Sequence, residues 1–279
     1  MKGRGSWKVV LLVFAFTMVF PSAVLAQERL KLSTTTSTEN SGLLYALLPP
    51  FEKMFNLKVD VIPVGTGKAL KLAENGDVDV TLVHARPLED KFVAAGYGVN
   101  RRDVMYNDFV LIGPESDPVG TKSAKKASEA FRLIAQNGAT FVSRGDKSGT
   151  HTKELAIWKQ AGLKPAGKWY LEAGKGMGEV LTMADEKRAY TLTDRGTYLA
   201  FAGGKKISLP VLFEGDPILF NPYGIIAVNP AKYPHVNYVK AIALIGWVTS
   251  QEGQKIIKGF GRDKFGQPLF RPMAIEDPR

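Results

Sequence analysis

The chain has 279 residues, of which 45% are hydrophobic and 23% are charged, and its formal net charge is +10. This balance is typical of a globular protein and excludes a disordered chain, and the length allows one large domain or two ordinary ones. The lysines and arginines are scattered, so they form no basic arm for nucleic acid. No cysteine is present, which excludes disulfides, thiol catalysis and a lipid-anchored cysteine.

The first 26 residues have the pattern of a secretory signal peptide. Three basic residues precede the apolar run 9–20, and small residues follow it up to Ala26. The run is too short to span a membrane, which needs about 20 apolar residues. We therefore expect cleavage after Ala26 and export of residues 27–279 to the periplasm.

Strand and helix patterns alternate along the rest of the chain. Residues 29–34 and 57–62 alternate as strands, and each run leads through a hydroxyl-rich or glycine-rich loop into a helical pattern. Residues 78–83 give a third strand pattern. This spacing predicts an α/β fold with parallel βαβ units, whose ligands bind beyond the carboxyl ends of the strands.

The stretch Ser143–His151 reads Ser-Arg-Gly-Asp-Lys-Ser-Gly-Thr-His and joins a strand pattern to an amphipathic helix. A helix start offers unpaired N–H groups and partial positive charge, and glycines let the backbone approach a ligand. Arg144 adds charge-assisted hydrogen bonds. The stretch predicts an anion site; the structural alternative is a capped helix with a surface pair between Arg144 and Asp146.

Two earlier loops repeat this design, Thr35–Thr38 and Gly65–Lys68. Hydroxyls before a helix are neutral donors for an anion, although the first loop could be a simple N-cap and the second a glycine turn. The second loop is not a nucleotide-binding P-loop. Ile62 stands where the first glycine belongs, and Ala69 replaces the required Ser or Thr.

Two strong strand patterns, 109–114 and 222–230, bracket the middle of the chain. They indicate that the chain crosses into a second domain and returns, with the two crossings acting as a hinge. The expected division is a first lobe of residues 27–113 plus 223–279 and a second lobe of residues 114–222.

Four segments, taken together, resemble the TupA family, the periplasmic tungstate-binding components of ABC importers. They are Leu32–Ser37, Gly65–Lys68, Ser143–His151 and Tyr190–Gly196. The resemblance covers nearly all of the mature chain. It implies a type II periplasmic binding protein, in which two α/β lobes joined by a two-strand hinge close on an oxyanion. It also implies a monomer that delivers tungstate to an ABC permease and its ATPase, without a cofactor or a metal bound as a free cation.

The predicted site residues come from both walls of the cleft. The expected oxyanion ligands are Thr35, Thr36, Ser37, Thr66, Gly67, Arg144, Ser148, Gly149 and Thr150. Residues expected to support the site or to reach it are Arg86, Asp146, Thr193 and Arg195. We expect Asp146 to orient the guanidinium of Arg144.

Which oxyanion the predicted site prefers depends on whether it holds a hydrogen-bond acceptor. Monohydrogen phosphate benefits from a carboxylate acceptor, whereas tungstate is fully deprotonated and needs only donors. In the similar phosphate-binding proteins a carboxylate follows the strand that here ends at Val83, but this chain continues His84-Ala85-Arg86. A donor-only site for tungstate is therefore expected, with molybdate, phosphate or sulfate as the alternative ions. Molybdate is nearly the same size as tungstate, so the sequence does not separate these two.

Other classes of function fit the sequence less well. A serine hydrolase would need Ser148 and His151, but the segment lacks the Gly-x-Ser-x-Gly elbow and the two residues lie only three positions apart. Cell adhesion through the Arg-Gly-Asp tripeptide 144–146 rests on three residues alone. His84 has no histidine or cysteine partner at metal-ligand spacing, so a structural role is favoured. We expect a binding protein and no enzyme.

Overall fold

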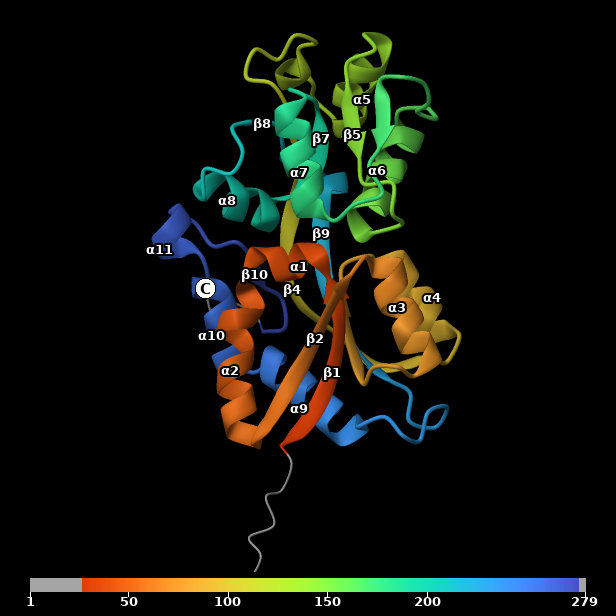
Figure 1. The fold of residues 1–279 in the computed structure, drawn as a ribbon, viewed down its shortest axis with the longest axis vertical. Coiled ribbons are helices and arrows are strands. Elements are labelled where there is room, and N and C mark those ends of the chain that lie inside the picture. The colour runs from red at the N-terminus through yellow and green to blue at the C-terminus, as the bar shows by residue number, and fades with distance from the viewer. Residues whose placement is uncertain (1–26, 276–279) are drawn as a thin grey trace, which may run out of the picture.

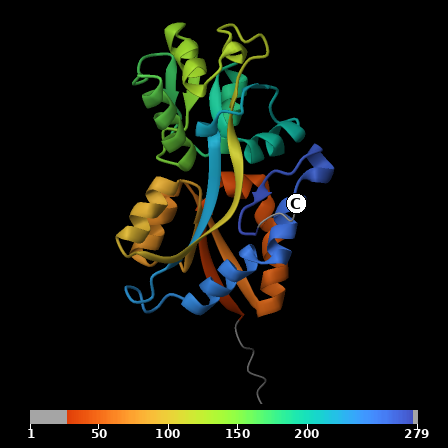
Figure 2. The same cartoon turned by 180° about the vertical axis from the view of Figure 1, so that it is seen from behind.

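The computed structural model describes residues 27–275, so the expected signal peptide lies outside the described residues. Two lobes stand one above the other in Figure 1, and two long strands run between them. These strands are β4 (Gly98–Ile112) and β9 (Phe220–Val228), which pair antiparallel. Both crossings are plain in the view from behind (Figure 2). In the part of the chain that the structure describes, no helix has the length and apolar character needed to cross a membrane.

The first lobe, the lower one in Figure 1, is built on a mixed sheet. Its β1 is parallel to both β2 and β3, and β9 is antiparallel to β3. Its further strands are β1 (Glu28–Thr35), β2 (Leu57–Val64), β3 (Val80–Val83) and β10 (Arg271–Pro272). Its helices are α1 (Thr36–Ser41), α2 (Leu43–Phe55), α3 (Thr66–Asn75), α4 (Arg86–Ala94), α9 (Tyr238–Thr249), α10 (Gln251–Gly259) and α11 (Arg262–Phe265).

The second lobe forms around the far end of β4. Strands β7 and β8 pair antiparallel with this end, and β5 is parallel to β6. Its strands are β5 (Phe141–Ser143), β6 (Tyr170–Glu172), β7 (Thr191–Asp194) and β8 (Val211–Phe213). Its helices are α5 (Ala127–Gln136), α6 (Gly149–Gln160), α7 (Met177–Glu186) and α8 (Arg195–Gly203), with short 3-10 turns η1 (Thr121–Ser123) and η2 (Pro217–Leu219).

Each lobe has its own apolar core. The apolar clusters of the first lobe extend along β4 as far as Met105 and resume on β9 at Tyr223. Those of the second lobe run from Phe109 to Leu219 and include Trp158, which packs edge-on against neighbouring aromatic rings. Among the described residues, the buried members of each cluster belong to one lobe, and Leu199 of α8 packs against the first-lobe cluster from the other side.

Helix α2 continues through Pro49 and Pro50, although a proline inside a helix usually kinks or breaks it. A proline removes one helical hydrogen bond and leaves an earlier carbonyl unpaired. Both prolines lie on the exposed face, where water can solvate those carbonyls. The opposite face buries Leu43, Leu47 and Phe51 in the core, and this packing keeps the helix continuous.

Candidate oxyanion-binding site

Helix N-termini from the two lobes meet between the lobes. The backbone N–H of Gly149, at the start of α6, donates to Oγ1 of Thr66, at the start of α3, over 3.0 Å. The hydroxyl of Thr197, in the first turn of α8, donates over 3.2 Å to the carbonyl of Ser37 in α1. Each N-terminus carries partial positive charge. Their convergence creates a region that favours an anion.

Arg144 lies in this region and is only 1% exposed. Its Nη2 group forms an ion pair with Asp146 and also lies 3.5 Å from Oγ1 of Thr36, on the opposite lobe. Its Nε and Nη1 groups are buried and have no hydrogen-bond partner within residues 27–275. Unpaired buried N–H groups of a cation are costly, and a tetrahedral oxyanion supplies the acceptors that they lack.

The loop after Arg144 shapes the start of α6. Ser148 caps the helix, and its hydroxyl accepts from the backbone N–H of His151 at 3.2 Å. Asp146 accepts from the backbone N–H of Ser148 at 3.1 Å, so one carboxylate holds both the guanidinium and the helix cap. Thr150 is fully buried, and its hydroxyl has no partner among the described residues. Arg144 and Thr150 thus provide the unpaired side-chain donors of this loop and helix start.

The hydroxyl cluster of α1 divides into two roles. Thr35 is the N-cap, as the structural alternative predicted, and its hydroxyl accepts from the backbone N–H of Thr38 and pairs with the Thr38 hydroxyl. Thr36 instead extends toward Arg144. It also lines a hollow of about 360 Å³ between α1 and the start of α7. Among the hydroxyls of this cluster, the geometry favours Thr36 as the one nearest the cation.

Glycines let the two walls approach closely. A side chain at Gly67 would come within 3.4 Å of the Lys147 carbonyl, and one at Gly149 within 2.9 Å of the His84 carbonyl. The first approach is tight and the second impossible without a shift. The predicted Gly67 and Gly149 therefore lie where the lobes meet, each facing backbone of the other lobe.

Comparisons with known proteins agree with this architecture. Residues 23–252 match the PBP superfamily domain. The tungstate-binding protein TupA of Peptoclostridium acidaminophilum is 47% identical over 247 residues, which cover 88% of this chain and 86% of that protein. The chain belongs to the TupA family of tungstate-binding proteins.

Two solved structures of such proteins resemble the chain along their whole length. The crystal structure of the tungstate ABC transporter from Geobacter sulfurreducens is 68% identical, with a TM-score of 0.78, and covers 84% of this chain and 100% of its own. The tungstate-binding protein TupA from Desulfovibrio alaskensis G20 is 44% identical, with a TM-score of 0.73, and covers 89% and 100%. The predicted family and the type II periplasmic binding fold are confirmed.

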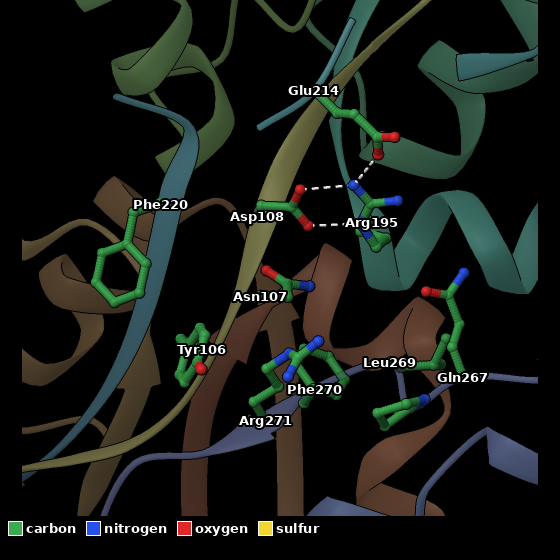
Figure 3. A pocket seen from close by; sticks show the side chains of 11 residues that line it. Tyr106, Asn107, Asp108, Arg195, Glu214, Phe220, Gln267, Leu269, Phe270 and Arg271 are labelled. Carbon is green, nitrogen blue, oxygen red and sulfur yellow. Dashed lines mark hydrogen bonds and ion pairs between the residues drawn. The ribbon is translucent and has the colours of Figure 1, made fainter. Parts of the chain in front are cut away.

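Two predicted supporting residues of this TupA-family chain are engaged with carboxylates. Arg86 is half exposed and bonds through Nε to Asp90 at 2.7 Å. Arg195 forms a two-pronged ion pair with Asp108 at 2.6 Å and a further ion pair with Glu214. The Arg195 cluster lines a separate cavity of about 540 Å³ beside β4 (Figure 3). Both guanidinium groups are ion-paired, as Arg144 is with Asp146, but Arg144 also has two buried N–H groups without a partner among the described residues.

Thr193, the remaining predicted supporting residue, and its neighbour Asp194 have local roles. The Thr193 hydroxyl is buried and donates to the carbonyl of Asp194 at 3.2 Å. Asp194 in turn caps α8 and accepts from both the N–H and the hydroxyl of Thr197. Sequence reasoning did not select Asp194 or Thr197. The Asp-x-x-Thr spacing before a helix, an N-cap signature, was the available signal.

His84 lies behind the start of α6. Its Nδ1 atom is 2.9 Å from Oδ1 of Asn221, and its ring stacks on Tyr223 with 4.6 Å between ring centroids. Burial lowers the pKa of His84, while the nearby Asp194 opposes that shift. A neutral ring with a satisfied Nδ1 agrees with the structural role that the sequence favoured. Within residues 27–275, no group of three or more His, Asp or Glu residues is arranged to hold a metal ion.

The geometry does not form a Ser–His catalytic pair. The Nδ1 atom of His151 accepts from the backbone N–H of Lys147 at 3.0 Å, and the hydroxyl of Ser148 accepts a helix N–H. Burial lowers the pKa of His151. Catalysis by a serine nucleophile requires a base in contact with its hydroxyl, and here both side chains instead act as structural elements of the loop.

Proposed function

We propose that this protein captures tungstate outside the cytoplasm, in the cleft between its lobes, and delivers it to an ABC importer. The observation that carries the proposal is the buried guanidinium of Arg144, which has two unpaired N–H groups where the lobes meet. Membership of the TupA family supports tungstate as the ion. The binding role needs no chemistry on the ion.

The chemistry of the neighbouring carboxylates supports a fully deprotonated ion. Asp146 already accepts from Arg144 and from the backbone N–H of Ser148. Asp194 already accepts from two groups of Thr197. A protonated ion such as monohydrogen phosphate needs a free acceptor, whereas tungstate is satisfied by N–H and O–H donors. Exclusion of water as the lobes meet strengthens each of these bonds.

The ligand set that we propose is Thr36, Thr66, Arg144, Ser148, Gly149 and Thr150. Thr35 and Ser37 shape the wall beside them, and Gly67 allows the lobes to approach. Asp146 orients the arginine. We further propose that the protein acts as a monomer in the periplasm, that its partners are the permease and ATPase of the importer, and that it uses no cofactor.

Calorimetric titration of the purified mature protein tests this function. Tungstate is expected to bind tightly with one ion per chain, and excess phosphate or sulfate is expected not to displace it. Molybdate competition then measures the selectivity between ions of nearly equal size. Phosphate binding that strengthens as phosphate gains a proton would contradict the donor-only site and point to Asp146 as an acceptor.

A further inference from the structure

A buried carboxylate, Glu154, lies directly behind the arginine loop. It is 1% exposed. Its oxygens accept from Oγ of Ser143 at 2.8 Å, from the hydroxyl of Tyr170 at 2.7 Å and from Nε1 of Trp158 at 3.1 Å. The Ser143 hydroxyl in turn accepts from the N–H of Gly145 at 3.2 Å, so the carboxylate is part of the network that fixes the loop on either side of Arg144.

All three of these side-chain donors are neutral, and no salt bridge joins Glu154 to a cation within the described residues. A buried carboxylate without a counter-charge is destabilised in its ionised form. Burial is the largest cause that raises the pKa of Glu154, to about 7, against the opposing hydrogen bonds of its donors. The group therefore changes charge near neutral pH.

Glu154 also lies on the binding side of its helix. It follows Thr150 by four residues in α6, and side chains four apart in a helix lie on the same face, one turn from each other. Thr150 carries one of the unpaired buried hydroxyls of the proposed site. A dianion held there would lie about one to two helical turns from the Glu154 carboxylate, through an interior of low dielectric.

We propose that Glu154 takes up a proton from solvent when the neighbouring site captures a dianion, so that tungstate binding is linked to pH. The proton binds to one carboxylate oxygen and removes a negative charge that would repel the ion. The hydroxyls of Ser143 and Tyr170 can rotate to accept from the protonated acid, so both forms remain hydrogen-bonded. By reciprocity, a falling pH favours tungstate through this group. The inference rests on the proposed function, because it requires the anion at this site.

Other ionisable groups in this part of the lobe do not reproduce the effect. The other ionisable groups around Glu154 come from the helices and strands packed near it and from their loops. They are His151, Arg144, Asp146, Tyr170, Glu172, Asp194 and Arg132. Burial lowers the pKa of His151 below its ordinary value of 6.5. Burial also raises the pKa of Tyr170, and the negative charge of Glu154 raises it further. Both groups stay in place in Glu154→Gln, so the difference in proton uptake between the parent and this variant isolates Glu154 from them.

The test is tungstate titration of the full mature protein in buffers of different ionisation enthalpy, between pH 7 and 8.5. The slope of the observed enthalpy against the buffer enthalpy gives the protons taken up per ion. The parent protein is expected to take up a substantial fraction of one proton. Glu154→Gln is expected to take up none and, for a coupling of one pKa unit, to bind about tenfold more tightly than the parent at pH 8.5.

Two comparison variants make the test specific. Glu172→Gln removes the same charge from an exposed position on β6, and its proton uptake is expected to equal that of the parent. Tyr170→Phe removes a donor to Glu154 and is expected to move the maximum of proton uptake to higher pH, which gives a second test should Glu154→Gln fail to fold. Tungstate binding without proton uptake in the parent, or with the same uptake in Glu154→Gln, would overturn the inference. Absence of tungstate binding in the parent would instead overturn the proposed function.

Discussion

The hydroxyl of Thr66 accepts the backbone N–H of Gly149 over 3.0 Å, and this bond joins the start of α3 in one lobe to the start of α6 in the other. Two helix N-termini carry like partial charges, so their approach is unfavourable unless negative charge lies between them. An oxyanion supplies that charge. Under the proposed function, this bond would link the meeting of the lobes to the capture of an anion.

Replacement of Thr66 by Val is expected to weaken tungstate binding by about 1–3 kcal/mol, because it removes a hydroxyl of the proposed ligand set and the bond that this hydroxyl makes to Gly149 across the lobes. Calorimetry gives the affinity. The matched control is Thr81→Val on β3, whose buried hydroxyl has no partner among the described residues. That variant is expected to bind as the parent does and to be equally or slightly more stable. Parental affinity in Thr66→Val would show that the bond does not contribute to capture.

Arg144→Ala is expected to cost roughly 2–5 kcal/mol of tungstate affinity, because a buried charged donor is removed from the site. Arg86→Ala is the control, since Arg86 is half exposed and paired with Asp90. Its affinity is expected to stay within about fivefold of the parent, because exposed ion pairs contribute at most about 1 kcal/mol. The reverse order of effects would transfer the ligand role from Arg144 to Arg86.

Gly149→Ala is expected to weaken binding more than it affects folding. The added Cβ would lie 2.9 Å from the His84 carbonyl and 3.1 Å from its ring, so it opposes the meeting of the lobes rather than the packing within either. Small-angle scattering is expected to report a larger radius of gyration in the presence of tungstate than for the parent. Gly246→Ala in α9 has open space around it and is expected to raise stability by about 0.5–1 kcal/mol without changing affinity. Unchanged affinity and compaction in Gly149→Ala would contradict this account.

Much of this organisation could be predicted locally. The helices Tyr238–Thr249 and Gln251–Gly259 follow directly from apolar periodicity and match α9 and α10. Helix α6 begins inside the Ser143–His151 stretch, because Ser148 is its cap and Gly149–His151 form its first turn. Apolar periodicity could not find that start, since the first turn consists of a glycine and polar residues. The helix start is instead identified by Ser148, a residue type that commonly caps helices.

The least predictable features depend on contacts between distant segments. Strand β4 begins at Gly98, well before the apolar run at 109–114, because its polar first half pairs with β9. The roles of Thr35 and Thr36 likewise depend on where Arg144 lies, 108 positions away from Thr36. Glu154 gave no signal at all in the sequence. Its importance follows from three donors brought together by the fold.

The raised pKa of Glu154 has a consequence for stability that is independent of any ligand. The carboxyl has a pKa of about 7 in the folded protein and an ordinary value of 4.5 when unfolded, so the folded state binds more protons between these values. Its favourable contribution is therefore complete below about pH 4.5 and is lost as pH rises through 7. The expected loss is about 3 kcal/mol, at 1.36 kcal/mol per pKa unit.

Glu154→Gln cannot ionise, so its free energy of unfolding relative to the parent is expected to rise by about that amount between pH 5 and 8.5. Urea unfolding at these two pH values measures the difference. The change between pH values is the informative quantity, because any hydrogen bond that the amide fails to replace lowers stability equally at both. Parallel pH profiles for the two proteins would mean that Glu154 has an ordinary pKa in the folded state, and would also remove the basis for proton uptake on tungstate binding.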